Sequence, residues 1–340
     1  MSTTSRQWIL DQRPTGEPTR ADFAIQTVDV PDPDDGEVLV RTRYVSVDPY
    51  MRDRMAPGES YASAWAVGDR VPAGGIGEVL ASAHERWAPG DLVVGQLAWA
   101  EHLIADGDRL QPVDPNVAPE PAYLGVLGLT GRTAYFGMLD VADPTPGDTV
   151  LVSGAAGAVG SVAGQLAGLS GARVIGIAGT DEKTSYLRDE LGFDGAINYT
   201  TQDVGAALDE HCPEGIDVYF DNVGGPITDA AFRRLATNAT VAVCGQIALY
   251  NATETPTGPR KLWQLVASEA SVEGFLVGSF ADRYEEANDR LAQWVQGDTL
   301  RTRRTIVEGF DRIPAAFQGL FEGRNVGKLL VAVSPARDDG

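Results

Sequence analysis

The stretch TVLVSGAAGAVGSVAGQLA, residues 149–167, decides the fold class of this chain. Residues 150–153 are mostly apolar and predict a buried strand, and the small residues from position 160 onward predict a helix. Between them, Gly154, Gly157 and Gly160 follow one another at a spacing of three. Such glycines permit a sharp strand-to-helix turn, a close approach of backbone to a pyrophosphate, and tight packing of the helix on the sheet. The free N–H groups at the start of the helix favour phosphate as well.

The match to G-x-G-x-x-G is incomplete, because Ala155 stands where the first glycine belongs. A tight strand–helix turn in another kind of α/β protein would show the same residues. The next apolar run, RVIGIAG at 173–179, favours a dinucleotide site, because it predicts a second parallel strand and completes a βαβ unit of about 30 residues.

The end of this second strand indicates which nicotinamide cofactor binds. A carboxylate there usually accepts hydrogen bonds from the ribose hydroxyls of NAD(H). Residues 177–180 read IAGT and hold no carboxylate, whereas Asp181 and Glu182 come only afterwards. Lys183 follows them, and Tyr199 ends the next expected strand. The chain has three lysines among 27 basic residues, which makes one at this position informative, although it could also be a solvated first-turn lysine. A lysine and a phenol suit a phosphate, so we expect NADP(H).

The charge balance excludes some classes of partner. The chain of 340 residues has 48 acidic and 27 basic residues, a formal net charge of −21. A field of this sign repels nucleic acid phosphates and an anionic membrane surface. The acid excess and the scarcity of lysine suggest a salt-adapted surface, with an ordinary acidic cytosolic protein as the alternative.

Targeting and metal signals are missing from the sequence. No run of 18 apolar residues occurs, and MSTTSRQWIL at the start lacks the pattern of a signal peptide. We therefore expect a cytoplasmic protein without a membrane segment. Cys212 and Cys244, with three scattered histidines, supply neither a disulfide framework nor a set of zinc ligands, so metal-free chemistry is expected.

The order of the expected elements predicts an α/β protein with two domains. Short strand-like runs separated by Pro and Gly turns fill residues 1–122 and indicate a β-rich, barrel-like domain. Strands alternate with helices over 123–297, as in a doubly wound parallel sheet of the Rossmann type. Residues 298–340 return to mixed structure, and the strand-like LLVAVS at 329–334 is expected to complete the N-terminal sheet.

Many short motifs, in order along nearly the whole chain, resemble the medium-chain dehydrogenase/reductase family. The resemblance is to its zinc-free branch, which contains prostaglandin reductases, plant alkenal double-bond reductases and bacterial curcumin-type reductases. That branch implies a GroES-like β-rich domain beside the Rossmann domain. The motifs are VDPYMR at 47–52, GGIG at 74–77, GLTGRTAY at 128–135, AAGAVG at 155–160, EK at 182–183, GFD at 192–194, NY at 198–199, FDNVGG at 220–225, CGQIALYN at 244–251, EGFLV at 273–277 and NVGK at 325–328.

The resemblance implies where the parts of NADP(H) bind. The glycine turn would hold the pyrophosphate, Lys183 and Tyr199 the 2′-phosphate, and four later segments the ribose and nicotinamide. Asn222 and Asn325 would be cofactor ligands, with plain turn residues as the alternative. The expected cofactor-binding residues are Gly157, Ala158, Val159, Gly160, Lys183, Tyr199, Asn222, Cys244, Gly245, Gln246, Ile247, Tyr250, Phe275, Leu276, Val277 and Asn325. Two departures are Leu249, where relatives commonly carry Ser, and Arg132, where they carry Leu.

The implied reaction is hydride transfer from NADPH to the β-carbon of an α,β-unsaturated aldehyde or ketone. The carbonyl oxygen gains enolate charge and needs a hydrogen-bond donor. Tyr250 is the candidate catalytic residue, acting with the cofactor ribose hydroxyl. Tyr50 and Met51 are expected to line the substrate pocket, with core packing beneath a barrel loop as the alternative.

Two other functions compete with this one. An NADPH quinone oxidoreductase of the same superfamily would share the fold and the cofactor, and a non-catalytic NADPH-binding sensor would bind without turnover. The resemblance also implies a homodimer that pairs cofactor domains edge to edge near residues 272–280.

Overall fold

The predicted strand–turn–helix forms as expected. Strand β8 (Thr149–Val152) leads through the glycine turn into helix α3 (Gly160–Leu169), and strand β9 (Arg173–Ala178) follows. The computed structural model describes residues 3–58 and 60–333. Contacts between residues divide the chain into two compact units: Met1–Leu124, Arg304–Asn325 and Leu329–Gly340 form the first, and Gly125–Arg303 with Val326–Lys328 the second. The domain limits expected from the sequence remain a prediction.

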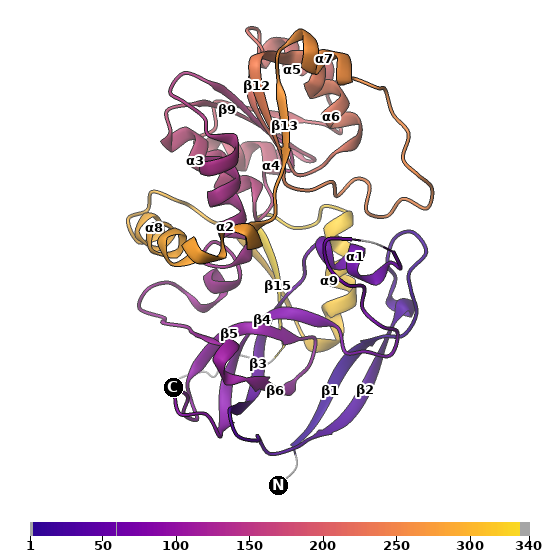
Figure 1. Cartoon of the computed structure of the whole chain (residues 1–340), viewed down its shortest axis with the longest axis vertical. Helices are drawn as coiled ribbons and strands as arrows, with labels where there is room; N and C mark the ends of the chain where they lie inside the picture. The colour runs from indigo at the N-terminus through magenta and orange to yellow at the C-terminus, as the bar shows by residue number, and fades with distance from the viewer. Residues whose placement is uncertain (1–2, 59, 334–340) are drawn as a thin grey trace. The chain divides into compact units, whose positions relative to one another are not determined.

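The second unit contains a six-stranded parallel sheet in the order β10-β9-β8-β11-β12-β13. Figure 1 labels its strands β9, β12 and β13. Each adjacent pair of strands is parallel. This confirms the doubly wound Rossmann-type sheet, because the first three strands and the last three extend in opposite directions from the centre. The four further strands are β10 (Gly195–Asn198), β11 (Ile216–Asp221), β12 (Leu235–Val243) and β13 (Ser271–Gly274).

Helices pack on both faces of this sheet. One face packs against buried side chains of α5 (Val204–His211) and α6 (Gly225–Ala231). On α3, a Cβ at Gly164 would lie 2.0 Å from the ring of Phe193, so only glycine allows this contact. The remaining helices of the unit are α2 (Leu129–Phe136), α4 (Asp181–Ser185), α7 (Leu262–Ala267) and α8 (Tyr284–Gln296).

The first unit is β-rich, as predicted. A seven-stranded sheet runs in the order β14-β15-β3-β4-β5-β7, with β6 paired to β3, and β1 and β2 form a separate pair. Strand β15 pairs with β3, so the tail joins the N-terminal sheet; Ser334, the last residue of the expected strand, lies outside the described residues. The elements are β1 (Thr3–Leu10), β2 (Phe23–Val30), β3 (Glu37–Ser46), α1 (Tyr50–Met55), β4 (Pro72–Ser82), β5 (Leu92–Ala98), β6 (His102–Asp106), β7 (Gln111–Pro112), β14 (Arg304–Glu308), α9 (Ile313–Phe321) and β15 (Lys328–Ala332).

Aromatic side chains from distant parts of the sequence build the core of the first unit. Trp8, Trp99 and Phe317 are completely buried, and Phe23 is nearly so. The ring centroid of Trp99 lies 5.3 Å from that of Phe23 and 5.8 Å from that of Phe317, in tilted and edge-on contacts. Aromatic pairs at these distances add stability beyond their buried area. They attach the C-terminal helix α9 to the N-terminal strands.

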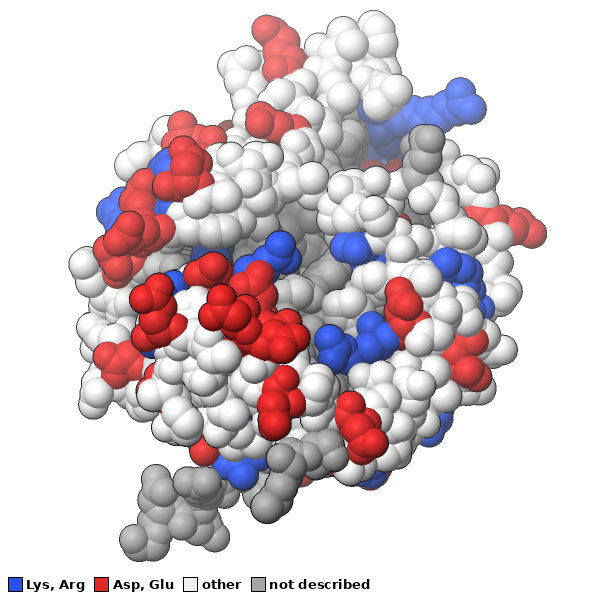
Figure 2. All heavy atoms as spheres, turned by 60° about the horizontal axis from the view of Figure 1, so that its bottom comes forward, with Lys and Arg blue, Asp and Glu red and all other residues white. Residues whose placement is uncertain are grey.

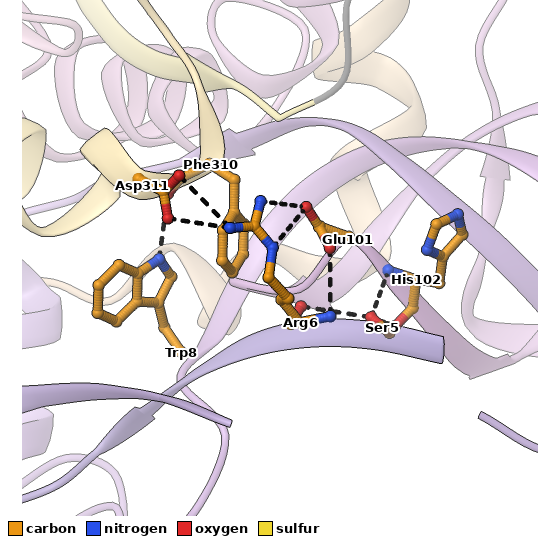
Figure 3. Close-up of polar contacts among 7 residues, drawn as sticks. All are labelled: Ser5, Arg6, Trp8, Glu101, His102, Phe310 and Asp311. Atoms are coloured by element: carbon orange, nitrogen blue, oxygen red, sulfur yellow. Dashed lines mark hydrogen bonds and ion pairs between the residues drawn. The ribbon is translucent and has the colours of Figure 1, made fainter. Parts of the chain in front are cut away.

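A polar cluster makes a second link between the two ends of the chain (Figure 3). The Arg6 guanidinium donates to Glu101 at 2.6 and 3.0 Å and to Asp311 at 3.2 Å. Its carbon lies 4.8 Å from the centre of the Phe310 ring, and Trp8 Nε1 donates to the Phe310 carbonyl at 3.1 Å. Burial opposes ionisation of Glu101, but the hydrogen bonds from Arg6 outweigh it and lower the pKa of that carboxyl.

The surface carries the acid excess seen in the composition. On the face shown in Figure 2, Asp and Glu side chains gather in patches. Such a surface gains from screening by dissolved ions, because like charges repel one another over about 8 Å at physiological ionic strength.

Candidate functional site

The candidate cofactor site lies where the order of the parallel strands reverses. The sheet is entered at β8, and the chain builds outward on one side through β9 and β10 and on the other through β11 to β13. Ligands of doubly wound sheets bind in the crevice at the carboxyl ends of the two strands flanking this point. Here Ser153 follows β8 and Asn222 follows β11, and Asn222 Nδ2 donates to the Ser153 carbonyl at 2.8 Å. The predicted residue Asn222 therefore lies beside the glycine turn.

The three glycines of the turn have separate structural reasons. Gly154 has a φ of +58°, in the left-handed region that favours glycine. A Cβ at Gly160 would lie 2.5 Å from the Gly154 carbonyl oxygen, so a larger residue does not fit there. At Gly157 a Cβ would meet that same oxygen at 3.1 Å and no other described atom within 4 Å beyond its chain neighbours. Gly157 thus leaves open backbone for the close approach that a pyrophosphate requires.

A segment late in the sequence is attached to this turn. The Gly327 N–H donates to the Ala156 carbonyl at 2.8 Å, and Gly327 and Gly157 form a short parallel bridge. Gly327 has a φ of +66°, and a Cβ there would lie 1.8 Å from the Arg303 carbonyl oxygen. Asn325 precedes this bridge by two residues and is assigned to the first unit. Its role in cofactor binding remains a prediction.

The end of β9 has the features expected for a 2′-phosphate site. The Tyr199 N–H donates to the Ala178 carbonyl at 3.1 Å, and the Tyr199 ring lies over Gly179, where a Cβ would be 2.8 Å from the phenol oxygen. The first carboxylate along the chain after β9 is that of Asp181, which accepts a hydrogen bond from Asn198 Nδ2 at 2.7 Å. Asp181 is therefore used within the protein, and the position usually taken by a ribose-binding acid is taken by a phenol.

Lys183 lies in the first turn of α4, which begins beside Tyr199. The Thr180 side chain accepts from the Lys183 N–H at 3.2 Å and caps the helix. Burial lowers the pKa of the Lys183 ammonium, and Glu182 opposes this. A half-buried ammonium gains from a nearby anion because less water surrounds its charge. This fits the expected contact with a phosphate.

Backbone hydrogen bonds bring the loop after β12 to the end of β11. The N–H groups of Cys244 and Gly245 both donate to the Asp221 carbonyl, at 2.8 and 3.0 Å, and the Ala248 N–H donates to the Val223 carbonyl at 3.0 Å. The predicted residues Cys244, Gly245, Gln246 and Ile247 are therefore held at the strand-order reversal, next to Asn222. Burial first, and then Asp221, raise the pKa of the Cys244 thiol to about 12, so it stays protonated at neutral pH. This agrees with a packing role and not a nucleophilic one.

The candidate catalytic phenol folds back over the start of this loop. Tyr250 Oη accepts a long hydrogen bond of 3.4 Å from the Gln246 N–H, and a Cβ at Gly245 would lie 3.2 Å from the same oxygen. A phenol that accepts an N–H still has its own proton to donate. The arrangement suits a hydrogen-bond donor held at a defined place on the loop.

The predicted nicotinamide segment at 275–277 directly follows the edge strand β13. The Phe275 ring packs edge-on against Phe220, with 6.2 Å between centroids, and a Cβ at Gly137 would lie 2.3 Å from it. Leu276 is half exposed, and Val277 begins the next helical turn. Packing of Phe275 therefore fixes the backbone whose pairing with the carboxamide is predicted.

The two expected substrate residues lie in the first unit, on α1. Met51 is fully buried in the aromatic core, and Tyr50 packs against the same cluster. Burial, and then Asp48, raise the pKa of the Tyr50 phenol. The full burial of Met51 is what the core-packing alternative expects, and a substrate role for both residues remains a prediction.

The carboxylate of Asp221 was not expected to have a role at the site, although the residue lies within the motif FDNVGG at 220–225. Asp221 is completely buried and accepts hydrogen bonds from three hydroxyls, those of Ser153, Tyr219 and Thr228. An acidic residue directly after the apolar run 218–220 is a signal that could have found it, because a buried carboxylate needs donors around it.

Two features are absent from the part of the chain that the structure describes. Among residues 3–58 and 60–333, no group of three or more His, Cys, Asp and Glu side chains could hold a metal ion. Within the same ranges, no helix has the length and apolar character needed to cross a membrane.

Comparison with known proteins assigns the family. Residues 6–113 match a family model described as the N-terminal domain of oxidoreductase, and residues 158–293 match one described as zinc-binding dehydrogenase. The chain belongs to the medium-chain dehydrogenase/reductase family, in the branch of the curcumin, prostaglandin and 2-alkenal reductases.

Individual relatives cover almost the whole chain. It is 48% identical to "Putative NADP-dependent oxidoreductase YfmJ" of Bacillus subtilis, over 98% of this chain and 99% of the relative. It is 38% identical to the NADPH-dependent curcumin reductase of Escherichia coli, over 97% of both chains. The crystal structure of CurA in complex with NADPH from Vibrio vulnificus is 39% identical and superposes with a TM-score of 0.92, over 97% of this chain and 100% of that one.

Proposed function

We propose that this protein is an NADPH-dependent reductase of the carbon–carbon double bond of α,β-unsaturated aldehydes and ketones. The observation that carries the proposal is the end of β9, where the Tyr199 phenol lies over Gly179 and Lys183 follows in the capped turn. A phenol and an ammonium there favour a 2′-phosphate over a free ribose hydroxyl. The relatives named as NADPH-dependent curcumin reductase and NADP+-dependent 2-alkenal reductase support both the cofactor and the substrate class.

The glycine turn is proposed to hold the pyrophosphate. Gly157 leaves room for close approach, and Ala158, Val159 and Gly160 carry the backbone into α3, whose first N–H groups attract anions. Asn222 and the loop from Cys244 to Tyr250 are proposed to line the ribose and nicotinamide, and the backbone at 275–277 to pair with the carboxamide.

Bound NADPH supplies the hydride that is added to the β-carbon of the substrate. The contribution of the chain is to stabilise the charge that develops on the carbonyl oxygen. We assign this to the Tyr250 hydroxyl, because a phenol donates a hydrogen bond without carrying charge. Solvent is the proposed source of the α-carbon proton, and no side chain is assigned to that step.

A cofactor and substrate comparison tests the proposal. Purified protein is mixed with NADPH or NADH and a series of 2-alkenals, cyclic enones and quinones, and cofactor oxidation is followed by absorbance. NADPH oxidation with enones, with NADH at least tenfold poorer in kcat/KM, is expected. Preference for NADH would overturn the 2′-phosphate assignment. Turnover of quinones only would instead show a quinone oxidoreductase, and tight NADPH binding without turnover would show a sensor.

We further propose that the protein forms a homodimer through the edge strand β13. All four residues of Ser271–Gly274 are exposed, and β13 ends the strand order of its sheet. The apolar side chains of Leu262, Trp263 and Val266 on α7 are 71%, 73% and 63% exposed. An open strand edge beside exposed apolar side chains is a ready pairing surface. Light scattering of the wild type and of Trp263→Glu tests this: a dimer that the variant converts to monomer is expected, and a monomeric wild type would contradict it.

A cytoplasmic location is proposed as well. Both cysteines are free thiols, and reduced cysteines are typical of that compartment. Cell fractionation with compartment markers checks it.

A further inference from the structure

Asp221 is a buried carboxylate surrounded by hydrogen-bond donors. It ends β11 with no exposed surface. Both of its oxygens accept hydrogen bonds, and the donors among the described residues are hydroxyls and backbone N–H groups. Oδ1 accepts from Ser153 Oγ at 2.9 Å, Tyr219 Oη at 2.8 Å, the Val223 N–H at 2.9 Å and the Gly224 N–H at 3.0 Å, and Oδ2 accepts from Thr228 Oγ1 at 2.6 Å.

All five hydrogen bonds are donated to the carboxyl oxygens, so this set of donors calls for an acceptor at the position. The two backbone N–H groups cannot reverse their role, so they specify an acceptor at Oδ1. Hydrogen bonds to a charged group are stronger than those between neutral groups, and a buried network with all members satisfied holds one arrangement. The carboxylate therefore fixes the turn from Asp221 to Gly224, and through Ser153 it joins that turn to the end of β8.

The same turn supports the loop after β12. The carbonyl of Asp221 accepts from the N–H groups of Cys244 and Gly245, and the carbonyl of Val223 accepts from that of Ala248. The side chain of Asp221 thus fixes the positions of the Asp221 and Val223 carbonyls, and these carbonyls accept the hydrogen bonds that hold the Cys244–Ala248 loop. Ser153 Oγ also accepts a hydrogen bond from the Asn222 N–H at 2.9 Å. This bond joins Asn222, which is predicted to line the ribose and nicotinamide, to the same network.

We propose that Asp221 is a positioning residue of the reductase. Its buried carboxylate fixes the turn that contains Asn222 and supports the Cys244–Ala248 loop. The nicotinamide side of the cofactor site is therefore formed before the cofactor binds. This rests on the proposed function for the identity of the cofactor. The network itself is independent of it, because all of its hydrogen bonds lie within the second unit. A pre-organised loop allows the cofactor to bind more tightly, since the loop loses less conformational freedom on binding.

Cys244 offers a reporter of this loop that does not depend on the cofactor. Burial and the neighbouring Asp221 raise the pKa of its thiol to about 12, and the reactive form of a cysteine is the thiolate. Cys212 is an internal reference, because burial raises its pKa to about 11 and the nearby carboxylate is Asp217, at the other end of β11. The two cysteines of the chain therefore report on the two ends of one strand.

The test compares Asp221→Asn with the matched control Asp217→Asn. Asp217 is on the same strand and also accepts a backbone hydrogen bond, from the Thr149 N–H at 2.8 Å, but it lies near the start of β11, whereas Asp221 and its bonds to the loop are at the end. Asn is nearly the same size as Asp and removes the charge without leaving a cavity. Asp221→Ala is added as a stronger perturbation. Thermal unfolding is measured for every variant, and all assays are run well below its midpoint.

Three readouts are taken: the Kd for NADPH by fluorescence titration, the KM for NADPH against kcat, and the rate at which N-ethylmaleimide labels each cysteine. In the labelling step the thiolate adds to the maleimide double bond and the adjacent carbon takes a proton from water. For Asp221→Asn we expect a roughly tenfold higher Kd and KM for NADPH with a much smaller change in kcat. We also expect roughly tenfold faster labelling of Cys244, with Cys212 unchanged. Asp217→Asn should leave the Kd and the Cys244 rate as in the wild type.

Several results would overturn the proposal. An unchanged Kd and an unchanged Cys244 rate in Asp221→Asn would show that the carboxylate does not position the loop. Equal effects of Asp217→Asn would show general destabilisation of β11. Faster Cys244 labelling with an unaltered Kd would refute the link to the cofactor site. A wild type that does not bind NADPH would refute the proposed function. Hydrogen exchange of the Cys244, Gly245 and Ala248 N–H groups in Asp221→Asn would still decide whether Asp221 holds the loop, because loss of the Asp221 charge speeds Cys244 labelling by itself.

Discussion

The Tyr199 ring packs directly over Gly179, so closely that a Cβ at Gly179 would lie 2.8 Å from the phenol oxygen. Gly179 follows the last residue of β9, where a ribose-binding acid is found in proteins that use NAD(H). The absence of a side chain at Gly179 is therefore what allows the phenol to occupy this place. The glycine at the end of β9 therefore contributes to the preference of the protein for NADP(H).

Lys183→Ala is expected to weaken the binding of NADPH without affecting the binding of NADH. Loss of one charge-assisted contact to a phosphate should raise the KM for NADPH roughly 10- to 100-fold, because such contacts contribute about 1.5–3 kcal/mol. Steady-state kinetics with both cofactors measure the ratio of the two kcat/KM values. Lys261→Ala is the matched control, since Lys261 lies outside the predicted cofactor site. An equal loss with NADPH and NADH would argue against a phosphate contact.

Tyr250→Phe is expected to slow the reaction more than it weakens binding. Removal of the hydroxyl takes away the donor to the developing enolate oxygen and should lower kcat/KM roughly 10- to 1,000-fold, as for other lost oxyanion donors. NADPH affinity, measured by titration, should change far less. Enone reduction at the wild-type rate would remove Tyr250 from the mechanism.

Acid unfolding should depend on Glu101. Its pKa in the folded protein is lowered by the hydrogen bonds from Arg6, which outweigh burial. A lowered folded pKa contributes stability that is present above the ordinary Glu value of about 4.3 and is lost as the pH falls through the folded pKa. Glu101→Gln should therefore lower the melting temperature near neutral pH by up to about 3 °C, because the pair is partly exposed. The difference should shrink as the pH falls below about 4.3 and vanish once the pH is below the folded pKa.

Asp311→Asn serves as the control for this acid effect, because Asp311 contacts the same guanidinium but its side chain is 64% exposed. Its effect on the melting temperature should be the smaller of the two. A Glu101→Gln variant that melts with the wild type at every pH would show that the cluster does not contribute to stability.

Salt should stabilise the protein, and the range over which it does so separates two interpretations of the acidic surface. With a net charge of −21, self-repulsion falls as ions screen it, and the screening length shrinks from about 10 Å at 0.1 M to about 3 Å at 1 M. Simple screening predicts a melting temperature that levels off below about 1 M salt. A salt-adapted surface predicts a continued rise at higher concentrations. A melting temperature that falls steadily with added salt would contradict both.

Local sequence was sufficient for the cofactor side of the fold. Glycine spacing between an apolar run and a small-residue helix predicts a phosphate-binding turn, because backbone freedom and helix N–H groups are properties of neighbouring residues. The missing acid after β9 and the presence of Lys183 could likewise be read from a few consecutive positions. Strand alternation was enough to expect a parallel sheet, since connections between adjacent parallel strands require intervening helices.

What the sequence by itself determined was the class of site and the cofactor it favours, while tertiary structure decided how the nicotinamide side is held together. Ser153 and Asp221 are 68 positions apart, and no local pattern shows that their side chains meet at 2.9 Å. The attachment of Gly327 to the glycine turn is of the same kind. Such bonds join segments that are distant in the sequence and that only the folded sheet brings together. The role of a buried carboxylate can be inferred only when the groups that donate hydrogen bonds to it are known.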